Sequence, residues 1–151
     1  MLSERLERVA NSIIDIHRQL FEESPTPMKL QKLCYYAQGY ALAEGNQLFD
    51  EDFQAWQHGP VLYDLYSKFK GYQWRQISED VEKLDEDNHE YLTDIVAAYG
   101  RYDGAALSTM THRESPWLEA RGELDESAGS TSVISKESLK LFFERKLKSH
   151  G

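Results

Sequence analysis

Residues 28–45 read M-K-L-Q-K-L-C-Y-Y-A-Q-G-Y-A-L-A-E-G, and residues 48–61 read L-F-D-E-D-F-Q-A-W-Q-H-G-P-V. The apolar residues of the first stretch recur at helical spacing, as in Leu30, Leu33, Ala37 and Tyr40. This periodicity predicts a helix over residues 27–43. Gly39 lies inside the helix, where glycine is unfavourable, and it predicts that another backbone passes close to this position.

An extended arm is predicted to follow this helix. A period-two pattern over residues 53–57 indicates a short strand, with Trp56 and His58 on the face opposite the apolar residues. The Gly-Pro pair ends the arm, and Pro60 is predicted to begin the next helix. Residues 74–77 are predicted to form a second short extended piece that could pair with the arm.

Helical periodicity continues on both sides of this region. An apolar stripe predicts a helix over residues 3–22, and the same stripe permits a seam with a second copy of the chain, hence a homodimer. Thr26 can cap the helix over residues 27–43, and Pro27 suits its first position because the missing N–H group would have had no partner there. Further helices are predicted near Pro60, Tyr91, Asp103, Trp117 and Ser135.

The fold class that follows is mainly α. We predict a single domain over residues 1–151, with about six helices and at most a short two-stranded β element. Residues 121–132 are small and polar and predict the clearest loop. An acidic run over residues 78–90 predicts a solvated loop or helix start.

The composition fits a folded, acidic protein. With 151 residues, of which 40% are hydrophobic, the chain can bury a core without disulfides or a structural metal. Seventeen basic and 26 acidic residues give a formal net charge of −9, which argues against nucleic-acid binding by this chain alone. We find no secretory signal pattern and no run of about 18 apolar residues, so we expect a cytoplasmic protein outside the membrane.

Residues that could support catalysis are few. The sequence has no phosphate-binding glycine loop, nucleophile elbow or H-E-x-x-H motif. Cys34 is expected to be a buried hydrophobe rather than a nucleophile. His112 and Glu114 form half of a zinc-deaminase signature, so a metal-dependent hydrolase is an alternative. Our prediction is a protein that is not an enzyme and needs neither cofactor nor metal.

Aromatic residues gather around the predicted arm. Tryptophan and tyrosine combine a large apolar surface with a polar group, and both are enriched at protein interfaces. The competing interpretation is core packing, which we favour for Tyr35, Tyr36 and Tyr40. For Trp56 the two interpretations are equally supported.

Three segments carry a resemblance to a known family. They are K-L-Q-K-L-C-Y-Y-A-Q-G-Y, F-D-E-D-F-Q-A-W-Q-H-G-P-V-L-Y-D-L-Y and, more weakly, T-H-R-E-S-P-W. In this order they resemble the Panacea domain, a SocA-like, phage-associated family. The resemblance implies an antitoxin of a bacterial or prophage toxin–antitoxin pair, which neutralises a cognate protein toxin by direct binding. Alternatives are an adaptor that delivers a toxin to a cytoplasmic protease, and a phage-encoded interaction protein.

The resemblance also implies roles for individual residues. Partner contact is expected from Lys32, Tyr36, Trp56 and His112, which match the family pattern, and from His58, which shares a face of the predicted arm with Trp56. The other positions that match the family pattern are Lys29, Leu30, Leu33, Phe53, Ala55, Gly59, Pro60, Val61, Tyr66 and Trp117. Of these, the apolar residues Leu30, Leu33, Phe53, Ala55 and Val61 are expected to support the fold.

Overall fold

The structure, a computed structural model, describes residues 2–150. Its elements follow one another as α1 (Glu4–Phe21), α2 (Pro27–Ala43), β1 (Phe53–Trp56), β2 (Gly59–Val61), α3 (Tyr63–Phe69), a 3-10 turn (Lys70–Tyr72), α4 (His89–Tyr99), α5 (Gly104–Thr111), α6 (Ser115–Arg121), β3 (Val133–Ile134) and α7 (Lys136–His150). The prediction of a mainly helical fold with a small β element is confirmed.

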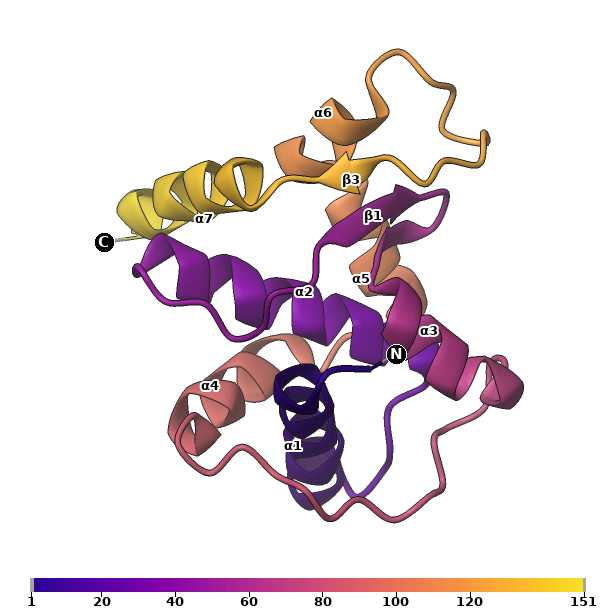
Figure 1. Ribbon diagram of the computed structural model, residues 1–151, viewed down its shortest axis with the longest axis vertical. Coiled ribbons are helices and arrows are strands. Elements are labelled where there is room, and N and C mark those ends of the chain that lie inside the picture. The colour runs from indigo at the N-terminus through magenta and orange to yellow at the C-terminus, as the bar shows by residue number, and fades with distance from the viewer. Residues whose placement is uncertain (1, 151) are drawn as a thin grey trace.

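Helix α2 lies at the centre of the fold. Figure 1 shows α7 along one side of it, α1 and α4 on the other, and the small sheet with α3 and α5 towards its amino end. The predicted cap is confirmed, because the Thr26 side chain accepts a hydrogen bond from the Lys29 amide and Pro27 occupies the first turn. Most of α2 between Leu30 and Leu42 is buried, as expected for a helix that neighbours cover on every side.

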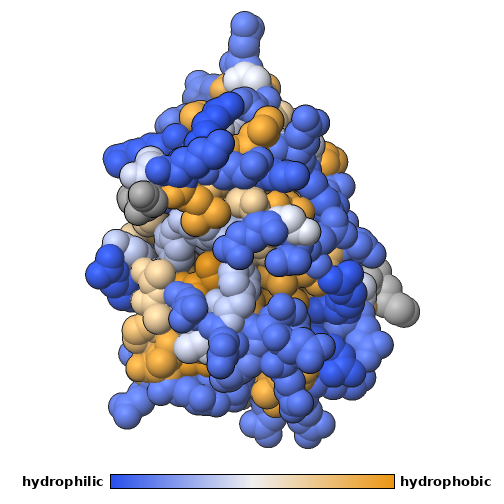
Figure 2. Space-filling view, turned by 90° about the vertical axis from the view of Figure 1, so that its left-hand side faces the viewer, coloured by the Kyte–Doolittle hydropathy of each residue, from blue (hydrophilic) through white to orange (hydrophobic). Residues whose placement is uncertain are grey.

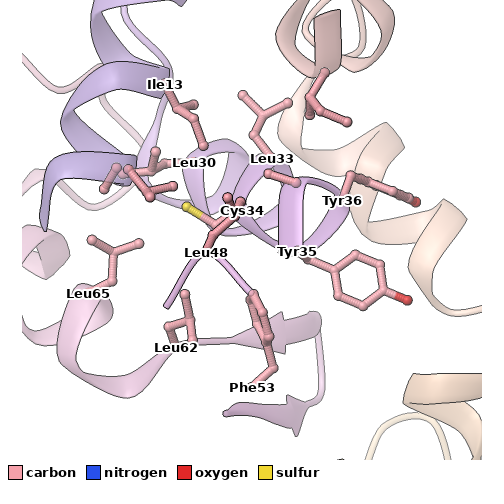
Figure 3. Packing of buried hydrophobic residues seen from close by; sticks show 14 of the residues in the cluster. Ile13, Leu30, Leu33, Cys34, Tyr35, Tyr36, Leu48, Phe53, Leu62 and Leu65 are labelled. Carbon is pink, nitrogen blue, oxygen red and sulfur yellow. The ribbon is translucent and has the colours of Figure 1, made fainter. Parts of the chain in front are cut away.

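The core forms around α2. In Figure 3, Leu30, Leu33 and Cys34 project from the helix among apolar side chains of α1, α3 and the segment before β1, and Tyr35 and Tyr36 point away toward the opposite side. Cys34 is completely buried, and burial raises the pKa of its thiol well above the ordinary value. The expectation that Cys34 is buried is therefore confirmed.

Helix α7 packs closely on α2 at Gly39. A Cβ atom at this position would overlap the Phe143 ring, which lies directly over the glycine. The predicted close approach is present, but the prediction that a backbone makes it is wrong, because the neighbour is an aromatic side chain from a distant helix.

Substitution of Gly39 by alanine tests this contact. We expect the free energy of unfolding to fall by about 1–3 kcal/mol, because overpacking against Phe143 outweighs the better helix propensity of alanine. Urea denaturation measures the change, and Gly71→Ala is the control, since nothing lies within 4 Å of a Cβ atom there. A Gly39→Ala protein as stable as the wild type would contradict the packing.

The sheet differs from the prediction in three ways, the first of which is that it has three strands rather than at most two. Its strand order is β2-β1-β3, so β1 pairs with residues 59–61 and 133–134, and the predicted pairing with residues 74–77 is wrong. Pro60 lies in β2 opposite Ala55, and α3 begins only at Tyr63, so the predicted helix start at Pro60 is also wrong. A proline is tolerated in β2 because this strand lies at the sheet edge.

The acidic segment is tied to α1. The Arg18 guanidinium donates to the carbonyl oxygens of Ile77 and Glu79, and the Asn11 amide donates to that of Lys83. Residues 78–88 have no regular helix or strand, so the predicted loop is confirmed. These contacts fix its backbone on α1 and leave Glu79, Asp80 and Glu82 exposed.

Candidate functional site

A groove of about 800 Å³ opens beside the amino-terminal half of α2. Its walls come from α2, the turn between β1 and β2, helix α3 and the loop residues 129–131. The apolar part of the surface includes Val61, Leu65 and Phe69. A concave site with apolar walls and a few polar groups is the usual form of a binding site.

Trp56 stands at the edge of this groove. Its indole is half-buried, its Nε1 donates to Gln54 Oε1 at 2.7 Å, and its ring meets Tyr66 edge-to-face with 4.9 Å between centroids. Tyr66 is 40% exposed, so the pair presents aromatic surface to solvent. Both rings line the groove, as does the exposed His58 on the turn.

Lys32 lies in the wall of the groove and is 1% exposed. Its Nζ donates to the Pro60 carbonyl oxygen at 3.2 Å, and no carboxylate of the described residues lies within ion-pair distance of it. Burial lowers the pKa of Lys32 from its ordinary 10.5 to about 7. The amino group of Lys32 is therefore buried with one hydrogen bond and without a charge partner among the described residues.

Gly59 allows this lysine and the turn to lie so close together. A Cβ atom at Gly59 would meet Lys32 Cε at 2.7 Å and Thr111 Oγ1 at 2.8 Å. The φ angle of Gly59 is +116°, a conformation that other residues rarely adopt. Ser108 on α5 adds a hydrogen bond from its hydroxyl to the His58 carbonyl oxygen.

Side chains of α6 hold the backbone of the arm in place by hydrogen bonds. The Trp117 indole donates to the Trp56 carbonyl oxygen at 2.7 Å, and the Arg121 guanidinium donates to that of Ala55 at 3.0 Å while lying 4.6 Å from the Trp117 ring. His112 stacks on Trp117 with 4.2 Å between centroids. The T-H-R-E-S-P-W segment thus positions Trp56 and is not itself the groove surface.

Comparison with known proteins identifies the family. The family model described as "Antitoxin SocA-like, Panacea domain" matches residues 30–118. The chain belongs to the SocA-like Panacea family. No curated protein and no solved structure matches it. The matched part of the Panacea chain begins within α2 and ends within α6, so it includes β1, β2, α3 and α5.

The Panacea chain also contains a buried polar cluster centred on Glu114. This side chain accepts hydrogen bonds from the hydroxyl groups of Tyr35 at 2.8 Å and Tyr36 at 2.9 Å, and Lys146 of α7 lies 3.7 Å away. Burial raises the pKa of Glu114, while Lys146 and the two hydroxyl groups oppose that rise. Tyr36 also stacks on Tyr99 with 4.0 Å between centroids.

This cluster has no local signature in the sequence, because Glu114 lies far along the chain from the tyrosines that it joins. No hydrogen bond joins the side chains of His112 and Glu114. His112 bonds to the backbone at Gln57, and its Nε2 is buried without a hydrogen-bond partner. A metal-dependent hydrolase would use His112 and Glu114 at one site, but the two side chains bond to different neighbours. Among residues 2–150 no three His, Cys, Asp or Glu side chains are grouped as metal ligands would be.

The structure separates the five residues expected to contact a partner. Trp56 and His58 line the groove, and Lys32 lies in its wall. Tyr36 is completely buried in the Glu114 cluster, so a partner cannot reach it. His112 does not line the groove and stacks on Trp117. Contact through the groove residues stays a prediction.

The remaining family positions of this Panacea chain are buried apolar residues and one lysine that joins two segments of the fold. Leu30, Leu33, Phe53 and Ala55 are fully buried, and Val61 is nearly so. Lys29 donates from Nζ to the Gly100 carbonyl oxygen and so ties α2 to the segment after α4.

Figure 2 shows one face on which hydrophilic side chains predominate, with hydrophobic residues visible between them. None of the helices within residues 2–150 combines the length and the hydropathy that crossing a membrane requires.

Proposed function

We propose that this chain is the antitoxin of a bacterial or prophage toxin–antitoxin pair and neutralises a cognate protein toxin by binding it directly. The membership in the SocA-like family carries the proposal. The groove supports it, because a half-buried tryptophan and a partly exposed tyrosine at one concave edge suit a protein interface. In this proposal the protein acts in the cytoplasm as a binding protein, not as an enzyme.

The arm around Trp56 should contribute more to toxin binding than the acidic segment. Truncation of an interface tryptophan typically costs about 2 kcal/mol or more, a loss of about 30-fold in affinity, whereas exposed charges at an interface rim contribute little. We therefore expect Trp56→Ala to weaken protection of cells that express the toxin. A triple variant with Glu79→Gln, Asp80→Asn and Glu82→Gln should still protect them.

The measurement is growth rescue. Products of neighbouring genes are expressed singly to find one that arrests growth, and each variant is then coexpressed with it. Trp74→Ala is the matched control, because Trp74 is 78% exposed and does not line the groove. Circular dichroism confirms that each variant folds.

Each outcome has a defined meaning. If folded Trp56→Ala protects fully and the charge variant fails, recognition is electrostatic and the role of the arm is wrong. If the wild type rescues growth from no neighbouring gene product, the antitoxin proposal itself is wrong. If the wild type does rescue growth, the half-life of the toxin distinguishes two mechanisms. Masking leaves the half-life unchanged, whereas delivery to a protease shortens it.

A further inference from the structure

The groove differs in charge from the chain that forms it. The chain carries 26 acidic residues and a net charge of −9. None of the described residues that line the groove is an aspartate or glutamate, while Lys32, Lys70 and His58 all line it. The groove is therefore free of acidic side chains, although acidic residues outnumber basic ones in the sequence.

Lys32 is the least expected of these groups. A buried cation without a carboxylate partner destabilises a fold, and a methionine would fill the same space beside Gly59 and Pro60 at lower cost. Its single hydrogen bond, to the Pro60 carbonyl oxygen, leaves most of its donor capacity unused. When Lys32 is protonated, protein rather than water surrounds its charge, which then acts across the groove wall more strongly than that of an exposed lysine.

The rest of the groove suits apolar side chains. Val61 and Leu65 lie along one wall, and the Trp56–Tyr66 pair offers flat aromatic surface at the edge. Exposed Lys70 also lines the groove. The complement of this surface is an apolar segment with negative charge at one point, rather than a uniformly acidic one.

From these observations we propose that the groove binds an apolar segment of the partner protein that carries an aspartate or glutamate, with the carboxylate lying against the wall at Lys32. The inference rests on the proposed function, since the partner is the toxin. It adds the chemistry of the toxin segment and assigns Lys32 as the residue that selects it.

The first test uses the purified full-length chain and the toxin found by growth arrest. Lys32→Met should weaken the complex at least about tenfold, as the loss of a charge pair near a low-dielectric wall predicts. Lys140→Met, an exposed lysine outside the groove, should leave affinity unchanged. One acidic residue of the toxin should show a matching loss when neutralised, and in a double-mutant cycle the two losses should not add.

Failures of the two proposals can be told apart. If the toxin binds but Lys32→Met binds it as tightly as the wild type does, the groove inference is overturned and the antitoxin proposal stands. If no neighbouring gene product binds, the antitoxin proposal falls. A second experiment that needs no toxin then decides on the groove.

That experiment selects short random peptides displayed on phage against immobilised wild type. Enriched peptides should share an acidic residue among apolar ones, and synthetic copies should bind Lys32→Met at least about tenfold more weakly. Replacing the acidic residue by its amide should weaken binding to the wild type and have no further effect on Lys32→Met. Two results would overturn the inference. One is the enrichment of peptides that lack a carboxylate. The other is that no peptide is enriched, while the fatty acid dodecanoate binds in a way that depends on Lys32.

Discussion

Replacing Glu114 by alanine should lower the free energy of unfolding by about 3–5 kcal/mol. Glu114 is 6% exposed, and its two oxygens accept hydrogen bonds from Tyr35 and Tyr36. Alanine leaves both buried hydroxyl groups without an acceptor and removes the carboxylate that faces Lys146. Urea denaturation at neutral pH measures the loss.

Two further variants attribute this loss to the cluster. Glu114→Gln keeps the shape and one acceptor oxygen, so it should cost clearly less than alanine. Changing Tyr35 and Tyr36 to phenylalanine removes the hydroxyl groups that need the acceptor, so Glu114→Ala should cost less in that background. A loss below about 1 kcal/mol for the single alanine variant would refute the role given to the cluster.

Raising the pH from about 7 to about 9.5 should stabilise the protein by about 3 kcal/mol through Lys32 alone. Burial lowers the pKa of this lysine from 10.5 to about 7, so across that window the unfolded chain holds the proton that the folded chain releases. Stability must therefore rise with pH, by about 1.4 kcal/mol per unit at most. Below about pH 7 both states are protonated, and the full cost of the buried charge persists.

The comparison with Lys32→Met isolates this contribution. The variant should lack the rise and should exceed the wild type in stability at about pH 6, whereas Lys140→Met should keep the wild-type pH dependence. The range ends at about 9.5 because Tyr91, whose pKa burial raises, is one of several tyrosines that affect stability at higher pH. Parallel curves for wild type and Lys32→Met would show that the lysine is not buried as a cation.

The sequence predicts an element best where its signal is local. Residues 27–43 were placed correctly because a capping threonine, a proline in the first turn and a helical period all lie within one short segment. The helix start predicted at Pro60 was wrong because it also relied on a local signal. A Gly-Pro pair is typical of a helix start, but pairing with strand β1 places Pro60 in an edge strand. Strand β3, only two residues long, has no local signal, and its partner β1 lies far away in the sequence.

The candidate site was only partly predictable. The alternation around Trp56 and His58 marked one face of the arm, and that face lines the groove. Lys32 shares the groove with them because α2 crosses behind the turn, a tertiary relation that no spacing reports. The burial of Tyr36 confirms the core packing favoured for it, but not its expected contact with a partner, because its hydroxyl group bonds to the buried Glu114 carboxylate.

The packing of Phe143 over Gly39 also has a consequence for synthesis. Helix α2 leaves the ribosome long before α7 is made, and until then the tyrosines near Gly39 lack the aromatic ring and the Lys146 ammonium that cover them. A nascent chain that stops before α7 therefore exposes an apolar helix that proteases and chaperones recognise. Burial of the aromatic residues of α2 therefore requires a chain in which α7 is also present.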